Sequence, residues 1–353
     1  MIWLTWRQFR VAAATTAAAL VVLAVALALT GPELASDYSA GITACTRDGG
    51  CAHFFARFFD DYEAPFQAAT VVVLVLPALI GLFWGAPLIT RELEAGTHLL
   101  VWNQSITRTR WLAVKLTVTG LAAATAAGLC SLAVTWWSAP LDKSAAPGFT
   151  LMDPLVFGAR AIVPMAYAAF AFVLGVTAGL IVRRTLPAMA LTLAVFAAVQ
   201  IAMPLTVRPH LLPPVSSSFK LTPENVDSFN KSSDEAFPQV ILNKAIPGNT
   251  GAWVLSSRLT DPSGHVVGGD GAPVTVRVSM TSGPCAPSQQ AQDPAQGFDA
   301  CIAEINRLGY RQEAIYQPFE RFWPLQWIET GIYVLVTAGL AGLCFRWIRR
   351  RLS

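Results

Sequence analysis

The chain has 353 residues, of which 54% are hydrophobic and 13% are charged, and its formal net charge is +3. Soluble domains carry about 25% charged residues, so this composition and a mean hydropathy of +0.49 exclude an ordinary soluble protein. The basic residues flank apolar runs, where membrane topology accounts for them, and they do not indicate nucleic-acid binding.

Six apolar runs are long enough to cross a bilayer, which takes about 20 residues. They are Val11–Thr30, Phe66–Thr90, Leu116–Trp137, Ala161–Val182, Thr185–Val207 and roughly Trp327–Phe345. The first five contain no Asp, Glu, Lys or Arg, and the sixth is weaker because Glu329 lies near its start. Continuous runs predict helices, because the strands of a membrane barrel would alternate and be far shorter.

Residues 1–10 predict a short amphipathic helix in the membrane interface. Ile2, Trp6 and Phe9 share one helical face, and Arg7 and Arg10 lie elsewhere. One alternative is an ordinary positively charged anchor. Another is a cleaved secretory signal, although the apolar run is longer than the usual h-region of about 7–15 residues.

The segment 31–65 is acidic and aromatic, and it is predicted to be an outer loop. Its doubled Phe pairs predict either a helix on the outer leaflet, which is the favoured interpretation, or a lid over an exit. Asp60, Asp61 and Glu63 are clustered, but a cation site needs convergent ligands that a sequence does not show.

Residues 91–115 form a charged segment between the second and third runs. It has an acidic, helix-forming head (Arg91, Glu92, Glu94), a break at Gly96 and Thr97, an apolar patch ending at Trp102, and a basic tail. This is more than a membrane-crossing loop needs, so the pattern predicts a docking element for a soluble partner.

Residues 208–326 are rich in Pro, Ser, Gly and Asn and predict a folded insertion. Runs at Trp253–Leu259, Val266–Val267 and Val274–Met280 predict strands, with a hairpin turn at residues 268–271 between the last two. Phe298–Leu308 predicts a helix.

The predicted fold class is an all-α polytopic membrane protein with six transmembrane helices and a small extracellular α+β insertion. Its parts are an interfacial helix (1–10), five spans with the cytoplasmic loop 91–115 (11–207), an extracellular domain (208–326), and the last span with a basic tail (327–353).

Lys and Arg are concentrated in one set of short flanks, which marks the cytoplasmic side. That set holds Arg7, Arg10, Arg91, Arg108, Arg110, Lys115, Arg183, Arg184, Arg346, Arg349, Arg350 and Arg351, and the opposite flanks hold only Arg47, Arg57, Lys143 and Arg160. Both termini are therefore predicted to be cytoplasmic.

The cysteines outside the spans all fall on the predicted outer side, where disulfides persist. Cys45, Cys51, Cys285 and Cys301 allow three pairings, and nearness in sequence favours Cys45–Cys51 and Cys285–Cys301. Free thiols at some of these positions are the alternative.

Small residues recur at four-residue spacing inside the runs, which lets helices approach closely. They are Gly120, Ala124 and Gly128, Gly175 and Gly179, and Ala338 and Gly342. Packing within the chain is favoured over a subunit interface.

The sequence contains no phosphate-binding Gly-x-x-x-x-Gly-Lys-Ser/Thr loop, no Gly-x-Ser-x-Gly elbow and no His-Glu-x-x-His helix. The runs hold almost no ionisable residues, which argues against an intramembrane enzyme and an ion-driven carrier. No catalytic residue, metal site or cofactor is predicted, and the energy must come from a partner.

Residues 91–115 resemble a signature of the permease subunits of type-2 ABC transporters, and are similar to actinobacterial members. The likeness lies in Glu-x-Glu-x-Gly-Thr-His (residues 92–98), an apolar run, Thr-Arg-x-Arg-Trp-Leu (residues 107–112) and Lys115. The chain departs from many members at Gln104-Ser105, where they have Pro, and in its larger outer domain.

The resemblance implies an ATP-driven exporter of the bacterial plasma membrane. ATP and Mg would be bound by two copies of a separate ATPase subunit, and the permease would pair as a homodimer or with a paralogue. The residues implied in ATPase coupling are Arg91, Glu92, Glu94, Gly96, Thr97, His98 and Trp102. Glu94 is expected to face a basic or hydrogen-bonding group of the ATPase.

The substrate implied is apolar or amphipathic, such as a drug, peptide or lipid. Candidate lining residues are Phe83, Trp84, Gln200 and Met203, for which lipid-facing or core packing is an equal alternative. A second function is a sensor whose outer domain binds a ligand without transport, and a third is a polytopic enzyme.

Overall fold

The structure is a computed structural model. It describes residues 2–47, 51–96, 107–144, 149–230, 237–249, 251–279, 282–286 and 294–351. The chain divides into two compact units. The helical unit comprises Met1–Ala145, Pro154–Leu211 and Trp323–Ser353, and the sheet unit comprises Ala146–Asp153 and Leu212–Phe322.

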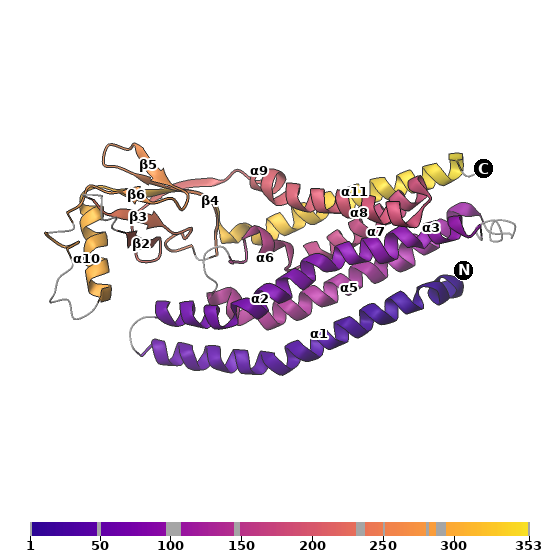
Figure 1. Cartoon of the computed structure of the whole chain (residues 1–353), viewed down its shortest axis with the longest axis horizontal. Coiled ribbons are helices and arrows are strands. Elements are labelled where there is room, and N and C mark those ends of the chain that lie inside the picture. Colours follow the sequence, from indigo (N-terminus) through magenta and orange to yellow (C-terminus); the bar gives the residue numbers. More distant parts are fainter. Residues whose placement is uncertain are drawn as a thin grey trace. The chain divides into compact units, whose positions relative to one another are not determined.

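The helical unit contains six helices that are long and apolar enough to cross a membrane, among the residues described. Its elements are α1 (Ile2–Cys45), α2 (Ala52–Ile80), the π-helix η1 (Gly81–Gly85), α3 (Ala86–Glu94), α5 (Arg108–Ser144), α6 (Pro154–Gly158), α7 (Val163–Val182), α8 (Thr185–Ala202), the π-helix η2 (Met203–Val207), α9 (Arg208–Leu211) and α11 (Phe322–Arg351). Within this unit the start of α1, the end of α3 and the end of α11 lie at one end (Figure 1).

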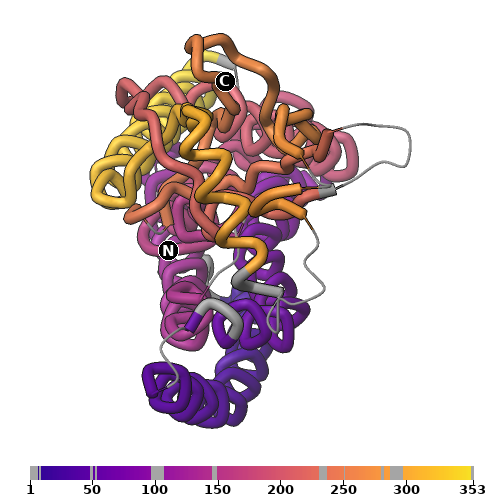
Figure 2. The backbone as a smooth tube through the Cα atoms, turned by 90° about the vertical axis from the view of Figure 1, so that its left-hand side faces the viewer, coloured from indigo at the N-terminus to yellow at the C-terminus, as the bar shows by residue number. Residues whose placement is uncertain are grey.

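The first two helices are longer than the sequence predicts. Helix α1 runs unbroken for 44 residues, or about 66 Å at 1.5 Å per residue, against a hydrocarbon core of about 30 Å. Residues 2–10 are therefore continuous with the first span, because no Gly or Pro interrupts the chain before Gly31. Figure 2 shows this helix, in indigo, at one edge of the unit.

The predicted loop 31–65 is largely helical, because α1 and α2 continue past the apolar runs as a hairpin. Aromatic contacts hold the hairpin together: the ring centroid of Tyr38 lies 6.2 Å from that of Phe54 and 5.5 Å from that of Phe58. Gly41 lets the Phe54 ring approach, since a Cβ there would lie 1.8 Å from it. The Cys45–Cys51 disulfide joins the two helices near the tip.

The α2–η1–α3 segment packs on α7 through glycines. A Cβ at Gly85 would lie 2.4 Å from the carbonyl oxygen of Phe172, and one at Gly175 would lie 2.4 Å from that of Gly81. Gly179 approaches the Ala86 carbonyl in the same way, at 2.9 Å. The predicted close approach at Gly175 and Gly179 is confirmed as packing within the chain, whereas a Cβ at Gly342 would meet no described atom within 4 Å.

In the part of the chain that the structure describes, the sheet unit has two antiparallel sheets and one long helix. Its elements are β1 (Val215–Phe219), β2 (Val226–Asn230), β3 (Gln239–Leu242), β4 (Trp253–Thr260), β5 (Val266–Gly269), β6 (Val274–Thr275), α10 (Pro294–Arg307), β7 (Arg311–Gln317) and the 3-10 helix η3 (Phe319–Arg321). The strand orders are β1-β7-β4-β5 and β2-β3-β6. The predicted strand at residues 253–259 and the predicted helix at residues 298–308 are confirmed.

The predicted hairpin at residues 266–280 is wrong. Strand β5 pairs with β4, and β6 belongs to the other sheet. The hairpin turn lies at residues 261–265, where the Asp261 carboxylate accepts hydrogen bonds from the backbone N–H groups of Ser263 and His265, both at 2.9 Å. These bonds also lower the pKa of Asp261, after the larger effect of the Ser263 hydroxyl.

The Cys285–Cys301 disulfide joins α10 to the core of the sheet unit. Both cysteines are buried beside Ile302 and Ile305. A bridge that closes a loop of this length stabilises a fold by about 3 kcal/mol in the chain-entropy account. Both pairs in the structure are those that nearness in sequence favours.

Candidate functional site

The head of the charged segment is the end of helix α3, which follows the π-helix η1. Pro87 lies in its first turn, a position that suits the fixed φ of proline. Gly96 follows the helix with a φ of +65°, which favours glycine. The predicted coupling residues Thr97, His98 and Trp102 lie outside the described residues.

An ion pair joins α3 to α5. Lys115 Nζ lies 2.5 Å from Glu92 Oε1, and the two side chains are only 3% and 12% exposed. Lys115 also lies over the Trp111 ring, 4.7 Å from its centroid. Salt and water screen a buried ion pair less than a surface pair. This ion pair therefore ties the end of α3 to the start of α5.

A second link joins α3 to α8 through Glu94. The Glu94 carboxylate accepts hydrogen bonds from the Thr185 backbone N–H at 2.7 Å and from the Thr185 hydroxyl at 2.8 Å. It thus satisfies an N–H at the start of α8, where a negative charge is favourable. Glu94 thus has hydrogen-bond partners within its own chain, and it is exposed to solvent. A contact of Glu94 with an ATPase subunit stays a prediction.

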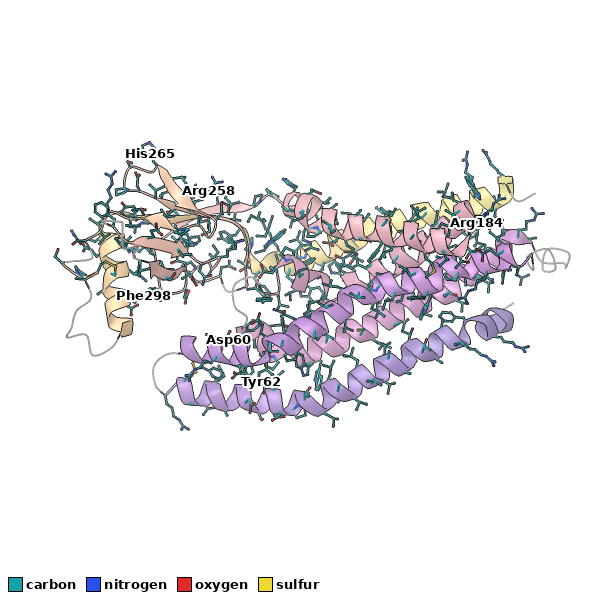
Figure 3. The ribbon with its side chains drawn as sticks, in the orientation of Figure 1. Asp60, Tyr62, Arg184, Arg258, His265 and Phe298 are labelled. Carbon is teal, nitrogen blue, oxygen red and sulfur yellow. A yellow bond between two sulfur atoms is a disulfide. The ribbon has the colours of Figure 1, made fainter. Side chains whose placement is uncertain are left out.

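The turn between α7 and α8 lies beside this link. Arg183 ends α7 in the left-handed conformation, with a φ of +58°, and Thr90 and Thr185 share a hydrogen bond of 2.8 Å between their hydroxyls. Arg91, Arg183 and Arg184 are exposed, and Figure 3 shows Arg184 at the end of the unit where α11 also ends. The site thus combines contacts between α3, α5 and α8 with a rim of exposed basic residues.

Two of the four candidate lining residues share one groove. Phe83 and Trp84 line a groove of about 240 Å³ together with Phe9, Ala12, Pro87, Leu88, Arg91 and Glu92. Gln200 and Met203 are not among its lining residues.

The four candidates differ in their burial. Phe83 is 57% exposed on the helical surface, and Trp84 is buried against Phe9, with centroids 4.5 Å apart. Met203 is buried at the start of η2, and Gln200 Nε2 is buried with no partner among the described residues. Three of the four lie on π-helical segments, which often occur at functional sites.

Sequence reasoning missed a buried ionic cluster in the helical unit. Arg208 Nε and Nη2 donate to the two carboxylate oxygens of Glu329 at 2.8 and 3.0 Å, and Tyr167 donates its hydroxyl to the same carboxylate. All three side chains are nearly inaccessible to water. Arg208 therefore belongs to the helical unit, whose second segment ends at Leu211.

A second buried pair lies between α5 and the turn that precedes α7. Arg160 Nη2 lies 3.6 Å from Asp142 Oδ1, and both side chains are buried. No guanidinium nitrogen of Arg160 has a hydrogen-bond partner among the described residues. This contact is looser than the bidentate bond of Arg208.

A family model described as ABC-2 membrane transporter related matches residues 17–208, which is more than half of the chain. No curated protein and no solved structure matches. The matched region contains α3 and its links to α5 and α8, and it covers three of the six candidate spans completely and most of two others. A transporter family favours transport over sensing as the role of the chain. The chain belongs to the ABC-2 membrane transporter related family, as a multi-pass permease.

Proposed function

We propose that the chain is the permease subunit of an ATP-driven exporter, and that α3 and the residues after it bind a separate ATPase subunit. The observation that carries the proposal is the set of links around α3. This helix is held to α7 by glycine contacts, to α5 by Glu92 and Lys115, and to α8 by Glu94 and Thr185.

With this arrangement, a movement of the bound ATPase subunit would be transmitted through α3 to the membrane helices. Packed elements with close backbone contacts move together rather than deform. A displacement of α3 would therefore shift α7, α5 and α8 at once. Helix α5 is 37 residues long and carries the Lys115 contact near one end and the Asp142 contact near the other, so it would transmit the motion along the unit.

In this proposal, the cytoplasmic end of the helical unit is the end where α1 starts and where α3 and α11 end. The Lys and Arg residues of the richer set of flanks support that orientation, and it places both termini on the ATPase side of the bacterial plasma membrane. ATP and Mg would be bound by two ATPase copies, one for each permease chain of a homodimer or a paralogue heterodimer. The apolar helices suit a substrate that is apolar or amphipathic.

Gly96→Val tests the proposal, because a β-branched residue is strained at a φ of +65°. A left-handed residue other than glycine costs about 1–2 kcal/mol. This cost corresponds to a roughly 5- to 30-fold lower population of the left-handed backbone at residue 96, which we take to be the conformation that binds the ATPase. We expect ATPase co-purification and permease-stimulated ATP hydrolysis to fall by about that factor. Both are measured on the complex extracted from its native membrane.

Gly248→Val is the matched control. Gly248 also has a positive φ, of +73°, and no described atom would lie within 4 Å of its Cβ, but it belongs to the sheet unit. The control therefore introduces the same backbone strain away from α3, and it should leave ATPase binding unchanged. Equal ATPase binding and hydrolysis in both variants would show that the segment after α3 is only a connector.

A further inference from the structure

A groove opens on the α1–α2 hairpin, at the end of these helices away from the N-terminus. Its volume is about 590 Å³, and its lining residues are Asp37, Phe54, Arg57, Phe58, Asp61 and Tyr62. Figure 3 labels Asp60 and Tyr62 on this part of α2. The hairpin is fixed by the nearby Cys45–Cys51 disulfide, so the groove has defined walls.

Aromatic rings form the apolar part of the groove. The ring centroid of Phe58 lies 5.5 Å from that of Phe54 and 5.3 Å from that of Tyr62. Phe58 is buried beneath the others, whereas Phe54 and Tyr62 are only partly buried. The last two rings therefore keep exposed surface toward the groove, and an aromatic face attracts cations through its quadrupole.

Carboxylates supply the polar part. Asp37 Oδ2 accepts a hydrogen bond of 2.8 Å from the Tyr62 hydroxyl, which holds one carboxylate against the aromatic cluster. Asp61 lies one residue before Tyr62 on α2 and is exposed. Glu33 adds to the negative field at Tyr62. Arg57 is the basic member of the lining, and it already has a partner within the chain.

We infer that this groove binds an organic cation that carries an apolar aryl or alkyl group. The cationic centre would lie against Phe54 and Tyr62, between the carboxylates of Asp37 and Asp61, and the apolar group would cover the aromatic floor. Charge complementarity selects this ligand class: two carboxylates against one guanidinium favour a cation over an anion, and a neutral molecule would desolvate the carboxylates without compensation.

A metal ion fits the groove less well. No group of three or more His, Cys, Asp or Glu residues that could hold a metal occurs in the described parts of the chain. Aromatic side chains supply no strong metal ligand, but they do recognise quaternary ammonium groups. The inference concerns ligand binding by the permease alone, so it holds or fails independently of the proposed ATPase coupling.

The test is calorimetric titration of the full-length permease in lipid nanodiscs with phenyltrimethylammonium, with empty nanodiscs as the blank. Benzenesulfonate, which has the same ring and the opposite charge, is the matched probe. We expect saturable binding of the ammonium probe and none of the sulfonate. Absence of binding above the blank, or equal binding of the two probes, would overturn the inference.

Variants that neutralise single carboxylates distinguish binding in the groove from nonspecific attraction to the negative surface. Asp37→Asn and Asp61→Asn should each weaken ammonium binding about threefold to fivefold, as expected for a charge contact that water partly screens. Asp60→Asn is the matched control, because Asp60 has the same charge and an adjacent position but does not line the groove. It should change the affinity by less than about twofold. An equal loss in the Asp60 and Asp61 variants would contradict a defined site.

Discussion

Gly175→Ala should lower the thermal unfolding midpoint of the purified permease by roughly 5–10 °C. The added Cβ would lie 2.4 Å from the Gly81 carbonyl oxygen and 2.7 Å from the Ala86 backbone nitrogen. Both are backbone atoms, so no side chain can rotate away, and α7 must separate from η1 and α3. Overpacking of this kind costs about 1–3 kcal/mol, and more where the backbone cannot move.

Gly339→Ala is the control for this prediction. Gly339 also lies within a spanning helix, but a Cβ at that position would meet no described atom within 4 Å. The same exchange should therefore leave the unfolding midpoint unchanged or raise it slightly, because alanine favours the helix. If Gly175→Ala were as stable as Gly339→Ala, the close crossing of α7 with η1 and α3 would be wrong.

Glu329→Gln should destabilise the helical unit by about 3–5 kcal/mol, because it leaves the buried Arg208 guanidinium without a counter-charge. The two side chains are 0% and 1% exposed, so water cannot replace the lost carboxylate. The midpoint of unfolding in detergent measures this loss. The double variant Arg208→Met with Glu329→Leu removes both charges, and it should recover much of the lost stability.

Glu304→Gln provides the matched comparison in the sheet unit. Glu304 pairs with Arg307 at 2.5 Å, but the arginine side chain is 70% exposed, so solvent compensates for the loss and the effect should be small. Similar effects of Glu329→Gln and Glu304→Gln would show that Arg208 and Glu329 are solvated, in contradiction to their burial here.

The features that sequence predicts best are those that depend on local pattern. Charge-free runs locate the spans, because a bilayer demands continuous apolar residues whatever their neighbours are. The strand at residues 253–259 and the helix at residues 298–308 are likewise each predicted from the residues of that element alone. The two disulfides join cysteines that are close in sequence, so nearness alone favours the observed pairing.

The features that sequence does not predict depend on distant partners. Glu329 and Arg208 are 121 residues apart, and Glu94 and Thr185 are 91 residues apart. Nothing local distinguishes their side chains from solvated ones. One signal existed for the first pair: Glu329 is the only acidic residue in a predicted span, where a charge needs a partner. The sequence predicted a helix at the doubled Phe pairs but not its pairing with α1, because the contacts of Tyr38 with Phe54 and Phe58 join two different helices.

Site-specific photo-crosslinking is the direct test of whether α3 contacts the ATPase subunit. A photoreactive side chain at position 91, on the exposed rim beside α3, should form an adduct with an ATPase subunit in native membranes, identified by mass spectrometry. The same group at position 265, an exposed position in the sheet unit, should form none. An ATPase adduct at position 265, or its absence at position 91 from a complex that hydrolyses ATP, would contradict the coupling role of α3.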